Sequence, residues 1–212
     1  MKLNITHKIV FILFITISVC SLYYHYHITT IYIIRHGEKV IATGVSDAPL
    51  TDSGKIQAKK LGTYLSSKKQ ISYLYASPMR RARQTAEIIA LQTGSSISFD
   101  DRLTEKNYRQ SSELYPDGTY IYVKFLKDAM KETKEQHLAR LLSFLKDNVH
   151  MMDKELYIVA HGGLVNRILE KIASDSGQLI AKHKIGYCSM FSFEYNKITN
   201  TFRYLNHFEL EN

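Results

Sequence analysis

The chain has 212 residues, 45% of them hydrophobic and 23% charged, a composition typical of one folded globular domain and unlike that of a disordered chain. Its formal net charge of +8 favours anionic partners, but the lysines and arginines are scattered, so we expect a solvated basic surface and no nucleic-acid interface. Cys20 and Cys188 are the two cysteines, which excludes a disulfide framework and a cysteine-based zinc site.

The first predicted element is an apolar segment near the N-terminus. Residues 9–24 carry no charge, follow Lys2 and Lys8, and end among aromatic residues, the pattern of a membrane-inserted helix with its N-terminus in the cytoplasm. We therefore predict that residues 1–27 form a signal anchor of a single-pass membrane protein, with the folded domain, residues 28–212, outside the cytoplasm. Because the run is shorter than the roughly 20 residues of a usual span, cleavage of a signal peptide, giving a secreted or periplasmic protein, is the alternative.

Beyond this segment, predicted strands alternate with predicted helices. Strands are expected at residues 30–34, 71–76, 96–99, 155–160, 190–195 and 201–204, and helices at residues 54–67, 79–91, 132–148 and 164–172. The segment 109–131 reads as irregular. This alternation predicts a three-layer α/β sandwich with a mostly parallel central sheet between helices, preceded by the N-terminal apolar helix.

Charged or histidine-containing motifs follow three of the predicted strands. Arg35-His36-Gly37 follows the first strand, Ser77-Pro78 leads from the second strand to Arg81, and His161-Gly162-Gly163 follows the strand at 155–160. In open α/β sheets the carboxyl ends of the strands line the ligand crevice. The sequence therefore predicts that these motifs converge.

The chemistry of these side chains suits phosphoryl transfer. Arginine guanidinium groups bind phosphate through paired, charge-assisted hydrogen bonds, and a neutral imidazole beside them can attack phosphorus. Donors from Arg35, Arg81 and His161 would stabilise the charge that spreads over the equatorial oxygens, with His36 as the nucleophile. A leaving alkoxide needs a proton, for which Glu105 is the candidate acid. No metal ion or organic cofactor is needed.

These motifs resemble those of the histidine phosphatase superfamily, whose phosphoglycerate mutases and small phosphatases share a strand followed by Arg-His-Gly-Glu, here Arg35 to Glu38. Other blocks similar to the family's are Pro49-Leu50-Thr51, Ser77-Pro78 with Arg81-Ala82, Glu132-Thr133 with Arg140, and Ala160-His161-Gly162-Gly163. The resemblance covers residues 30–210 and marks residues 28–212 as the catalytic domain.

The resemblance also implies a role for each site residue. His36, Glu105 and His161 are the expected catalytic residues, and Glu105 matches the family's proton donor. Arg35, Arg81 and Gly162 are expected to bind the substrate phosphate. Tyr108, close to Glu105 in the chain, is a possible substrate contact.

The sequence departs from the family pattern at two positions near the nucleophile. Ala42 stands where the family often has asparagine, which removes one phosphate contact, and Lys39 replaces the more usual serine or threonine. The mutases have longer inserts than the segment 109–131, so a phosphatase is favoured over a mutase.

We therefore predict a phosphomonoesterase that acts on a phosphorylated small molecule or phosphoprotein. The alternatives are a mutase-like phosphotransferase, a protein phosphohistidine phosphatase and, in a different class, a phosphate-binding protein without turnover.

Overall fold

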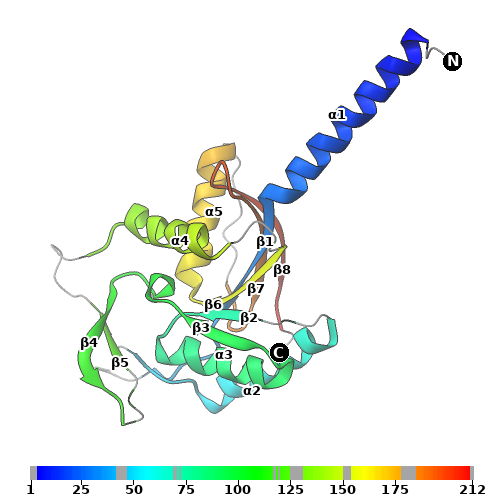
Figure 1. Ribbon diagram of the computed structural model, residues 1–212. Helices are drawn as coiled ribbons and strands as arrows, with labels where there is room; N and C mark the ends of the chain where they lie inside the picture. Colours follow the sequence, from blue (N-terminus) through cyan, green and yellow to red (C-terminus); the bar gives the residue numbers. More distant parts are fainter. Residues whose placement is uncertain are drawn as a thin grey trace.

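The computed structural model describes residues 4–41, 47–68, 71, 73–116, 118, 120–124, 131–149, 154–177 and 185–210. After the N-terminal helix α1 (Ile5–His27), strands and helices alternate as the sequence predicts (Figure 1). The strands are β1 (Ile28–Arg35), β2 (Tyr73–Ala76), β3 (Ser96–Phe99), β4 (Tyr108–Leu114), β5 (Tyr120–Lys124), β6 (Glu155–Ala160), β7 (Met190–Asn196) and β8 (Thr201–Phe208). The helices are α2 (Asp52–Lys68), α3 (Arg80–Thr93), α4 (Lys134–Asn148), α5 (Gly162–Ser176) and a short 3-10 turn, η1 (Asp101–Leu103).

The central sheet has six strands in the order β3-β2-β6-β1-β7-β8. Pairings β3-β2, β2-β6 and β6-β1 are parallel, whereas β7 pairs antiparallel with β1 and with β8. The prediction of a mostly parallel α/β sheet is therefore confirmed. Four parallel strands end at one edge of this sheet, as parallel strands must.

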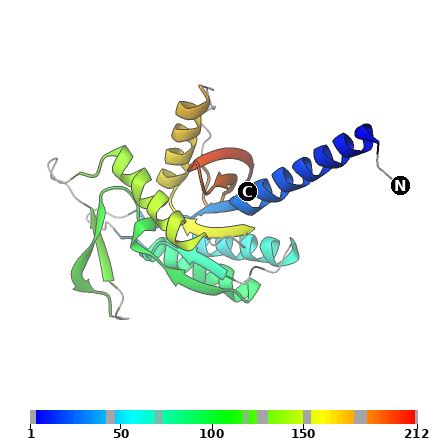
Figure 2. The ribbon, with the colours of Figure 1, turned by 45° about the horizontal axis from the view of Figure 1, so that its top comes forward.

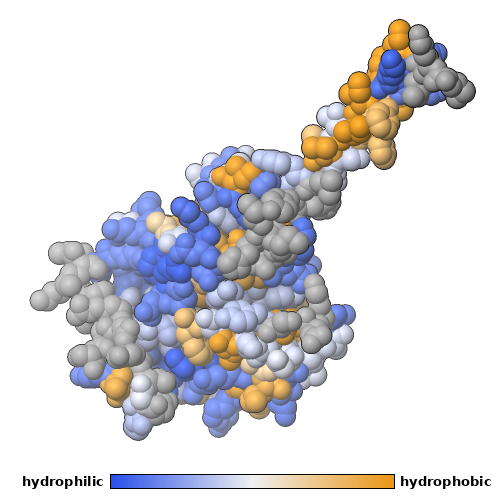
Figure 3. All heavy atoms as spheres, viewed as in Figure 1, coloured by the Kyte–Doolittle hydropathy of each residue, from blue (hydrophilic) through white to orange (hydrophobic). Residues whose placement is uncertain are grey.

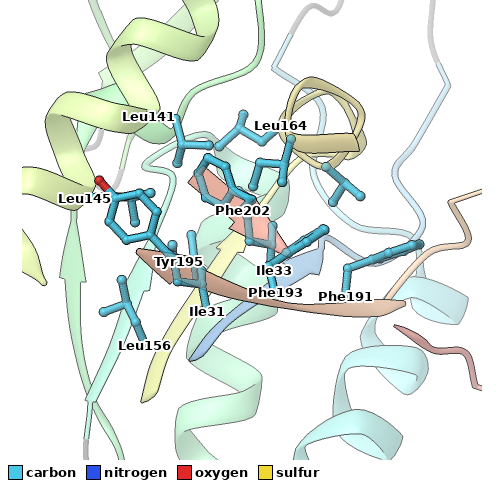
Figure 4. Packing of buried hydrophobic residues seen from close by; sticks show 14 of the residues in the cluster. Ile31, Ile33, Leu141, Leu145, Leu156, Leu164, Phe191, Phe193, Tyr195 and Phe202 are labelled. Carbon is cyan, nitrogen blue, oxygen red and sulfur yellow. The ribbon is translucent and has the colours of Figure 1, made fainter. Parts of the chain in front are cut away.

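Helices cover both faces of the sheet, as the two views of the ribbon show (Figures 1 and 2). Successive side chains of a strand point to opposite faces, so Ile31 and Ile33 of β1 enter one core cluster and Ile34 enters the other. The first cluster contains the apolar faces of α4 and α5, and Figure 4 shows Leu141 and Leu164 packed over β1 and β7. The second contains the apolar faces of α2 and α3. The result is the predicted three-layer sandwich.

Four of the described helix ends have clear capping chemistry. Thr51 Oγ1 accepts a hydrogen bond from the Gly54 main-chain nitrogen at the start of α2, and Thr133 forms a reciprocal capping box with Gln136 at the start of α4. Helix α3 ends at Gly94 and α5 at Gly177, both in the left-handed conformation. Because caps are local, they hold these helix ends in place independently of the core.

Helix α1 extends away from the sheet, and its side chains form a largely apolar surface (Figures 1 and 3). Among the described residues, however, no helix is both long enough and apolar enough to cross a membrane. The uncharged run at 9–24 falls short of a usual span, and Lys8 lies in the same helix just before it. The prediction of a transmembrane signal anchor is therefore wrong, as are the single-pass location and the membrane contact through residues 9–24.

The segment 109–131 also differs from its prediction. The structure places an antiparallel pair there, β4 and β5, as a separate two-stranded sheet beside the main one (Figure 1). The sequence 120–124 is rich in tyrosine and β-branched residues, which favour strands, and Pro116 and Gly118 lie before it in a turn. The signal was present locally, but the short length of each strand obscured it.

Candidate active site

The predicted motifs meet where the parallel strands end. Arg35 is the last residue of β1 and His36 follows it, while His161 follows β6 and Ser77 follows β2. Main-chain hydrogen bonds continue the ladder past these ends: the His36 nitrogen donates to the Ala160 carbonyl at 3.0 Å, and the Ser77 nitrogen to the Val159 carbonyl at 2.9 Å. The site is therefore built on the sheet itself, which positions side chains more rigidly than a loop does.

The turn after His36 is packed too tightly for a side chain. A Cβ atom at Gly37 would lie 2.6 Å from the Gly54 carbonyl oxygen, and one at Gly54 would overlap the main chain of Glu38. The Glu38 nitrogen donates to Gln57 Oε1 at 2.9 Å, and the Thr51 nitrogen donates to the Glu38 carbonyl at 2.9 Å. Glu38 thus joins the turn after His36 to the start of α2.

The His36 ring is held as a neutral imidazole with its Nε2 lone pair available. Nδ1 lies 2.7 Å from the Gly37 carbonyl oxygen, and because a carbonyl can only accept, Nδ1 carries the proton. Nε2 accepts a hydrogen bond from Arg81 Nε at 3.1 Å, which is the expected partner of an unprotonated nitrogen. Burial, and next the Arg81 charge, lower the pKa of His36 well below its usual value. The ring therefore stays neutral at physiological pH.

Arg81 is almost completely buried, and three acidic or aromatic groups surround its guanidinium. Nη1 lies 3.7 Å from Asp47 Oδ1, Nη2 lies 3.6 Å from Glu105 Oε2, and the Tyr108 ring centroid is 5.5 Å from Cζ. Asp47 also accepts from the main-chain nitrogens of Arg80, at 2.9 Å, and Tyr122, at 3.3 Å. Asp47 therefore joins the arginine to strand β5.

Glu105 and His161 form the other side of the site. His161 is fully buried, its Nε2 lies 2.9 Å from Ser77 Oγ, and its Nδ1 lies 3.5 Å from Glu105 Oε2. Within the described part of the chain, His161 Nδ1 has no hydrogen-bond partner despite its burial. Burial, and next the Arg81 charge, lower the pKa of His161 well below its usual value. This atom is thus a buried polar group that a substrate oxygen could satisfy.

Ligand atoms of His36, Glu105 and His161 lie within 4.8 Å of one another, near enough in distance alone to hold a metal ion. The guanidinium of Arg81 contacts His36 and Glu105, however, and the charges of Arg81 and Arg35 both lower the pKa of His161. Two buried or partly buried positive charges favour an anion at this position over a cation. The donor set therefore suits a phosphate group better than a metal.

A cavity of about 330 Å³ opens beside these groups. Its lining includes the predicted residues Arg35, His36, Glu105 and Gly162, and also Lys39, Gly163, Asn166 and Ile185. Arg35 donates to the Ile185 carbonyl, and its guanidinium stacks on Tyr187 with Cζ 4.1 Å from the ring centroid. Both contacts orient the guanidinium at the cavity wall.

All the predicted site residues lie in or next to this cluster. Arg35, His36, Glu105 and Gly162 line the cavity, His161 and Arg81 contact Glu105, and Tyr108 lies against Arg81. Ala42, where the family often has asparagine, lies outside the described residues.

Five residues around the site were not predicted from the sequence as site residues. They are Lys39, Asp47, Ser77, Asn166 and Tyr187. Asn166 follows Gly162 by one helical turn on α5, a spacing that could have indicated it. Ser77 belongs to the motif after β2, but Asp47 and Tyr187 reach the site only through tertiary contacts.

A substitution at Gly163 tests how precisely the Glu105 carboxylate must be positioned. A Cβ at Gly163 would overlap Glu105 Oε1, the far end of a partly exposed side chain that can move. We expect Gly163→Ala to lower phosphatase activity about 10-fold to 100-fold by displacing the carboxylate. Stability should hold or rise, because alanine favours a helix over glycine by roughly 0.5–1 kcal/mol. Steady-state kinetics and thermal unfolding measure both, and a folded variant with full activity would contradict this placement.

The stability of the protein should depend on pH through its buried histidines. Burial, and next the charge of Arg140, lower the pKa of His137 to about 4, and the pKa values of His36 and His161 are lowered as well. In the unfolded chain each histidine binds a proton below about pH 6.5, whereas in the folded protein it does so only at lower pH. The contribution of these histidines to folding stability is therefore fully present above about pH 6.5, and it is lost as the pH falls below that value.

For His137 this window runs from about pH 6.5 to about 4, with a slope of about 1.4 kcal/mol per pH unit. Urea unfolding at pH 7.5, 6 and 5 should show the fall, and His137→Gln should make it shallower. An unfolding free energy that is constant from pH 7.5 to 5 would refute the expectation.

Comparison with known proteins agrees with this geometry. A model of the histidine phosphatase superfamily (branch 1) matches residues 31–207. The chain is 31% identical over 158 residues to "Putative phosphoserine phosphatase 2" of Hydrogenobacter thermophilus, covering 66% of this chain and 76% of that protein. It is 29% identical over 176 residues to the "Uncharacterized phosphatase PhoE" of Bacillus subtilis, covering 76% and 86%.

Among solved structures, a mycobacterial glucosyl-3-phosphoglycerate phosphatase in complex with inorganic phosphate shares the fold. Its TM-score is 0.59 at 20% identity, with 84% of this chain and 96% of that chain covered. The superfamily match spans most of the chain and includes every motif gathered at the sheet edge. The chain therefore belongs to the histidine phosphatase superfamily.

Proposed function

We propose that the protein is a phosphomonoesterase that forms a phosphohistidine on His36. The observation that carries the proposal is the state of the His36 ring, whose proton is on Nδ1 and whose Nε2 lone pair lies beside Arg81. A buried neutral imidazole next to guanidinium groups is a nucleophile prepared for an anionic phosphate. Relatives named as phosphatases support hydrolysis as the reaction type.

The substrate phosphate would occupy the cavity in front of His36. Arg35 supplies a guanidinium at the wall, and Gly162 begins α5, where main-chain N–H groups and the helix dipole favour an anion. His161 Nδ1 would also contact a phosphate oxygen. For attack, the Arg81 donor that now contacts His36 Nε2 would pass to a phosphate oxygen, which releases the lone pair toward phosphorus.

In the first step the Nε2 lone pair forms a bond to phosphorus and the bond from phosphorus to the ester oxygen breaks. The leaving oxygen takes a proton from the Glu105 carboxyl group and departs as an alcohol. Arg35 and Arg81 stabilise the charge on the equatorial oxygens during transfer. The products of this step are phosphohistidine, an ionised Glu105 and the free alcohol.

In the second step the Glu105 carboxylate takes a proton from water as the water oxygen attacks phosphorus. The bond from phosphorus to nitrogen breaks, and the electron pair returns to His36 Nε2. Inorganic phosphate leaves, and both residues regain their starting protonation states. The same carboxyl group therefore acts as acid and then as base.

The substrate extends beyond the phosphate. A second hollow of about 690 Å³ adjoins the first, since Arg35 and Ile185 line both. Its wall mixes Lys60, Glu209 and Tyr187 with apolar Ile56 and Leu210. We place the leaving group of a phosphorylated small molecule or a phosphorylated side chain there.

Rapid acid-free quenching with a radiolabelled phosphomonoester tests the proposal. The label should appear on the protein as a species that is stable to base and labile to acid, as expected of phosphohistidine, and then as inorganic phosphate. A panel of phosphosugars, phosphoamino acids and phosphohistidine peptides would separate hydrolysis from phosphoryl transfer between positions of one molecule. Tight phosphate binding without turnover of any of them would refute the proposal and favour a non-catalytic phosphate-binding protein.

A further inference from the structure

We propose that Arg140, held by Glu132, is a positioning residue that fixes the segment carrying Glu105. The inference rests on the proposed role of Glu105 as proton donor. It adds that a helix outside the cavity holds the Glu105 segment in position. Arg140 lies on α4, two turns beyond its start, and it is not among the residues that line the cavity.

Glu105 needs such a support because it lies outside the regular elements. It follows η1 and precedes β4, so no sheet ladder determines its position. Its main-chain nitrogen contacts Met79 Sδ at 3.5 Å, a weak acceptor, and its carboxylate lies 3.5–3.6 Å from His161 and Arg81. These contacts are longer than strong hydrogen bonds, and the bonds from Thr104 to the Asp101 carbonyl, at 2.8 and 3.1 Å, lie within the same turn. A hold from another element would therefore add to the positioning of Glu105.

Arg140 provides that hold through the main chain just before Glu105. Its Nη1 donates to the Arg102 carbonyl at 2.7 Å and to Thr104 Oγ1 at 3.3 Å, and its Nη2 donates to the Thr104 carbonyl at 3.4 Å. Thr104 is bonded directly to Glu105. One planar guanidinium therefore binds two positions, Arg102 and Thr104, of the turn that presents the acid.

Glu132 fixes the guanidinium itself. Arg140 Nε donates to Glu132 Oε1 at 2.5 Å and Nη2 to Oε2 at 2.8 Å, a paired geometry that determines the plane of the group. Glu132 stands just before Thr133, the N-cap of α4, whose capping box makes this helix start well defined. Lysine has a single ammonium and cannot keep both the pair with Glu132 and the two carbonyl contacts.

The geometry leads to a specific kinetic signature. Misplacing the acid slows the departure of an alkoxide, which needs a proton, but hardly slows that of nitrophenolate, which does not. For Arg140→Lys we expect kcat/KM for an alkyl phosphate to fall about 10-fold to 100-fold, and kcat/KM for p-nitrophenyl phosphate to change less than about 3-fold. Glu132→Gln should show the same selectivity in weaker form. The value of kcat/KM reports only the steps up to the first irreversible one. Slower hydrolysis of the phosphohistidine, which comes later, therefore does not affect the comparison.

The matched control is Arg203→Lys. Arg203 makes the same paired contact, with Glu194 on β7, through Nε at 2.8 Å and Nη2 at 2.6 Å, but on the surface of strands β7 and β8. This variant should leave both kcat/KM values unchanged. Loss of activity toward both substrates equally in Arg140→Lys would indicate general damage to the fold and overturn the positioning role.

A second measurement is independent of turnover. Hydrogen exchange of the whole protein, followed by mass spectrometry, should show faster exchange in residues 101–105 of Arg140→Lys and no change there in Arg203→Lys. Unchanged exchange in this segment would overturn the inference even if the enzyme is active. If the parent protein hydrolyses no phosphomonoester, the proposed function fails, and the exchange result still decides whether Arg140 holds the segment.

Discussion

His36→Ala should lower the hydrolysis of p-nitrophenyl phosphate by about 10⁴-fold or more, because it removes the atom that forms the bond to phosphorus. The other histidine of the site is engaged elsewhere: His161 Nε2 lies 2.9 Å from Ser77 Oγ, and its Nδ1 lies 3.5 Å from Glu105 Oε2. The variant should also fail to trap radiolabelled phosphate. Vanadate, a phosphate analogue, should inhibit the parent protein.

The control for this substitution is His7→Ala, which removes an exposed histidine of α1 far from the cavity. It should keep full activity and full labelling. Circular dichroism and thermal unfolding would show whether the His36 variant folds, since His36 is buried and its removal leaves space behind. A folded His36→Ala protein that hydrolyses p-nitrophenyl phosphate at the parent's rate would exclude the phosphohistidine mechanism.

Glu105→Gln should separate the two steps of the reaction. Glutamine keeps the shape of the side chain but can neither give a proton to the leaving oxygen nor take one from water. We expect kcat/KM for an alkyl phosphate to fall by about 10²-fold to 10⁴-fold, and kcat/KM for p-nitrophenyl phosphate to fall much less, because nitrophenolate leaves without help. Hydrolysis of the phosphoenzyme should become slow with either substrate.

Stopped-flow measurement with p-nitrophenyl phosphate should then show a burst of nitrophenolate followed by a slow steady state. Phosphorylated protein should accumulate in the variant to a higher level than in the parent. Glu87→Gln is a suitable control, since Glu87 is an exposed residue of α3 whose carboxylate lies 3.9 Å from Arg83 Nη1. Equal loss of activity toward both substrates, with no burst, would show that Glu105 is not the acid and base.

The strands of the main sheet and the helices that cover it could be predicted because their sequence signals are local. Residues 155–160 form β6 with the predicted bounds, and α3 and α4 differ from their predictions by two residues or fewer at each end. Helix periodicity, Pro78 before α3 and the threonine cap of α4 all act within a few residues of the element they specify. The convergence of the motifs at one edge followed from the rule for parallel sheets.

Two predictions failed for different reasons. The N-terminal segment was assigned to a membrane from its charge pattern and aromatic border, but the length and apolarity of the described helix do not suffice for a span. Segment 109–131 was considered irregular, and yet it contains the β4–β5 pair. Strands of five to seven residues around a turn carry too little periodicity to be recognised without their partner.

The role of Glu105 is a feature that local sequence signals alone do not predict. Little in Leu103-Thr104-Glu105 distinguishes this carboxylate from other acids of the chain; the need for a proton donor made Glu105 a candidate, and the resemblance to a family supported it. In the structure the turn η1 follows β3, and Arg140 of α4 donates to the Arg102 carbonyl of this turn. Such contacts join residues about 40 positions apart, which no short motif encodes.

By itself, the sequence determined the residue types and their places along the chain: a histidine after β1, another after β6, and arginines that can neutralise a phosphate. It determined these because strand and helix periodicity and turn chemistry act over short stretches. Only the tertiary structure decided what state His36 adopts. Its burial under the sheet edge, the Gly37 carbonyl at Nδ1 and the Arg81 donor at Nε2 make it neutral with a lone pair in place, and the last of these comes from 45 residues away.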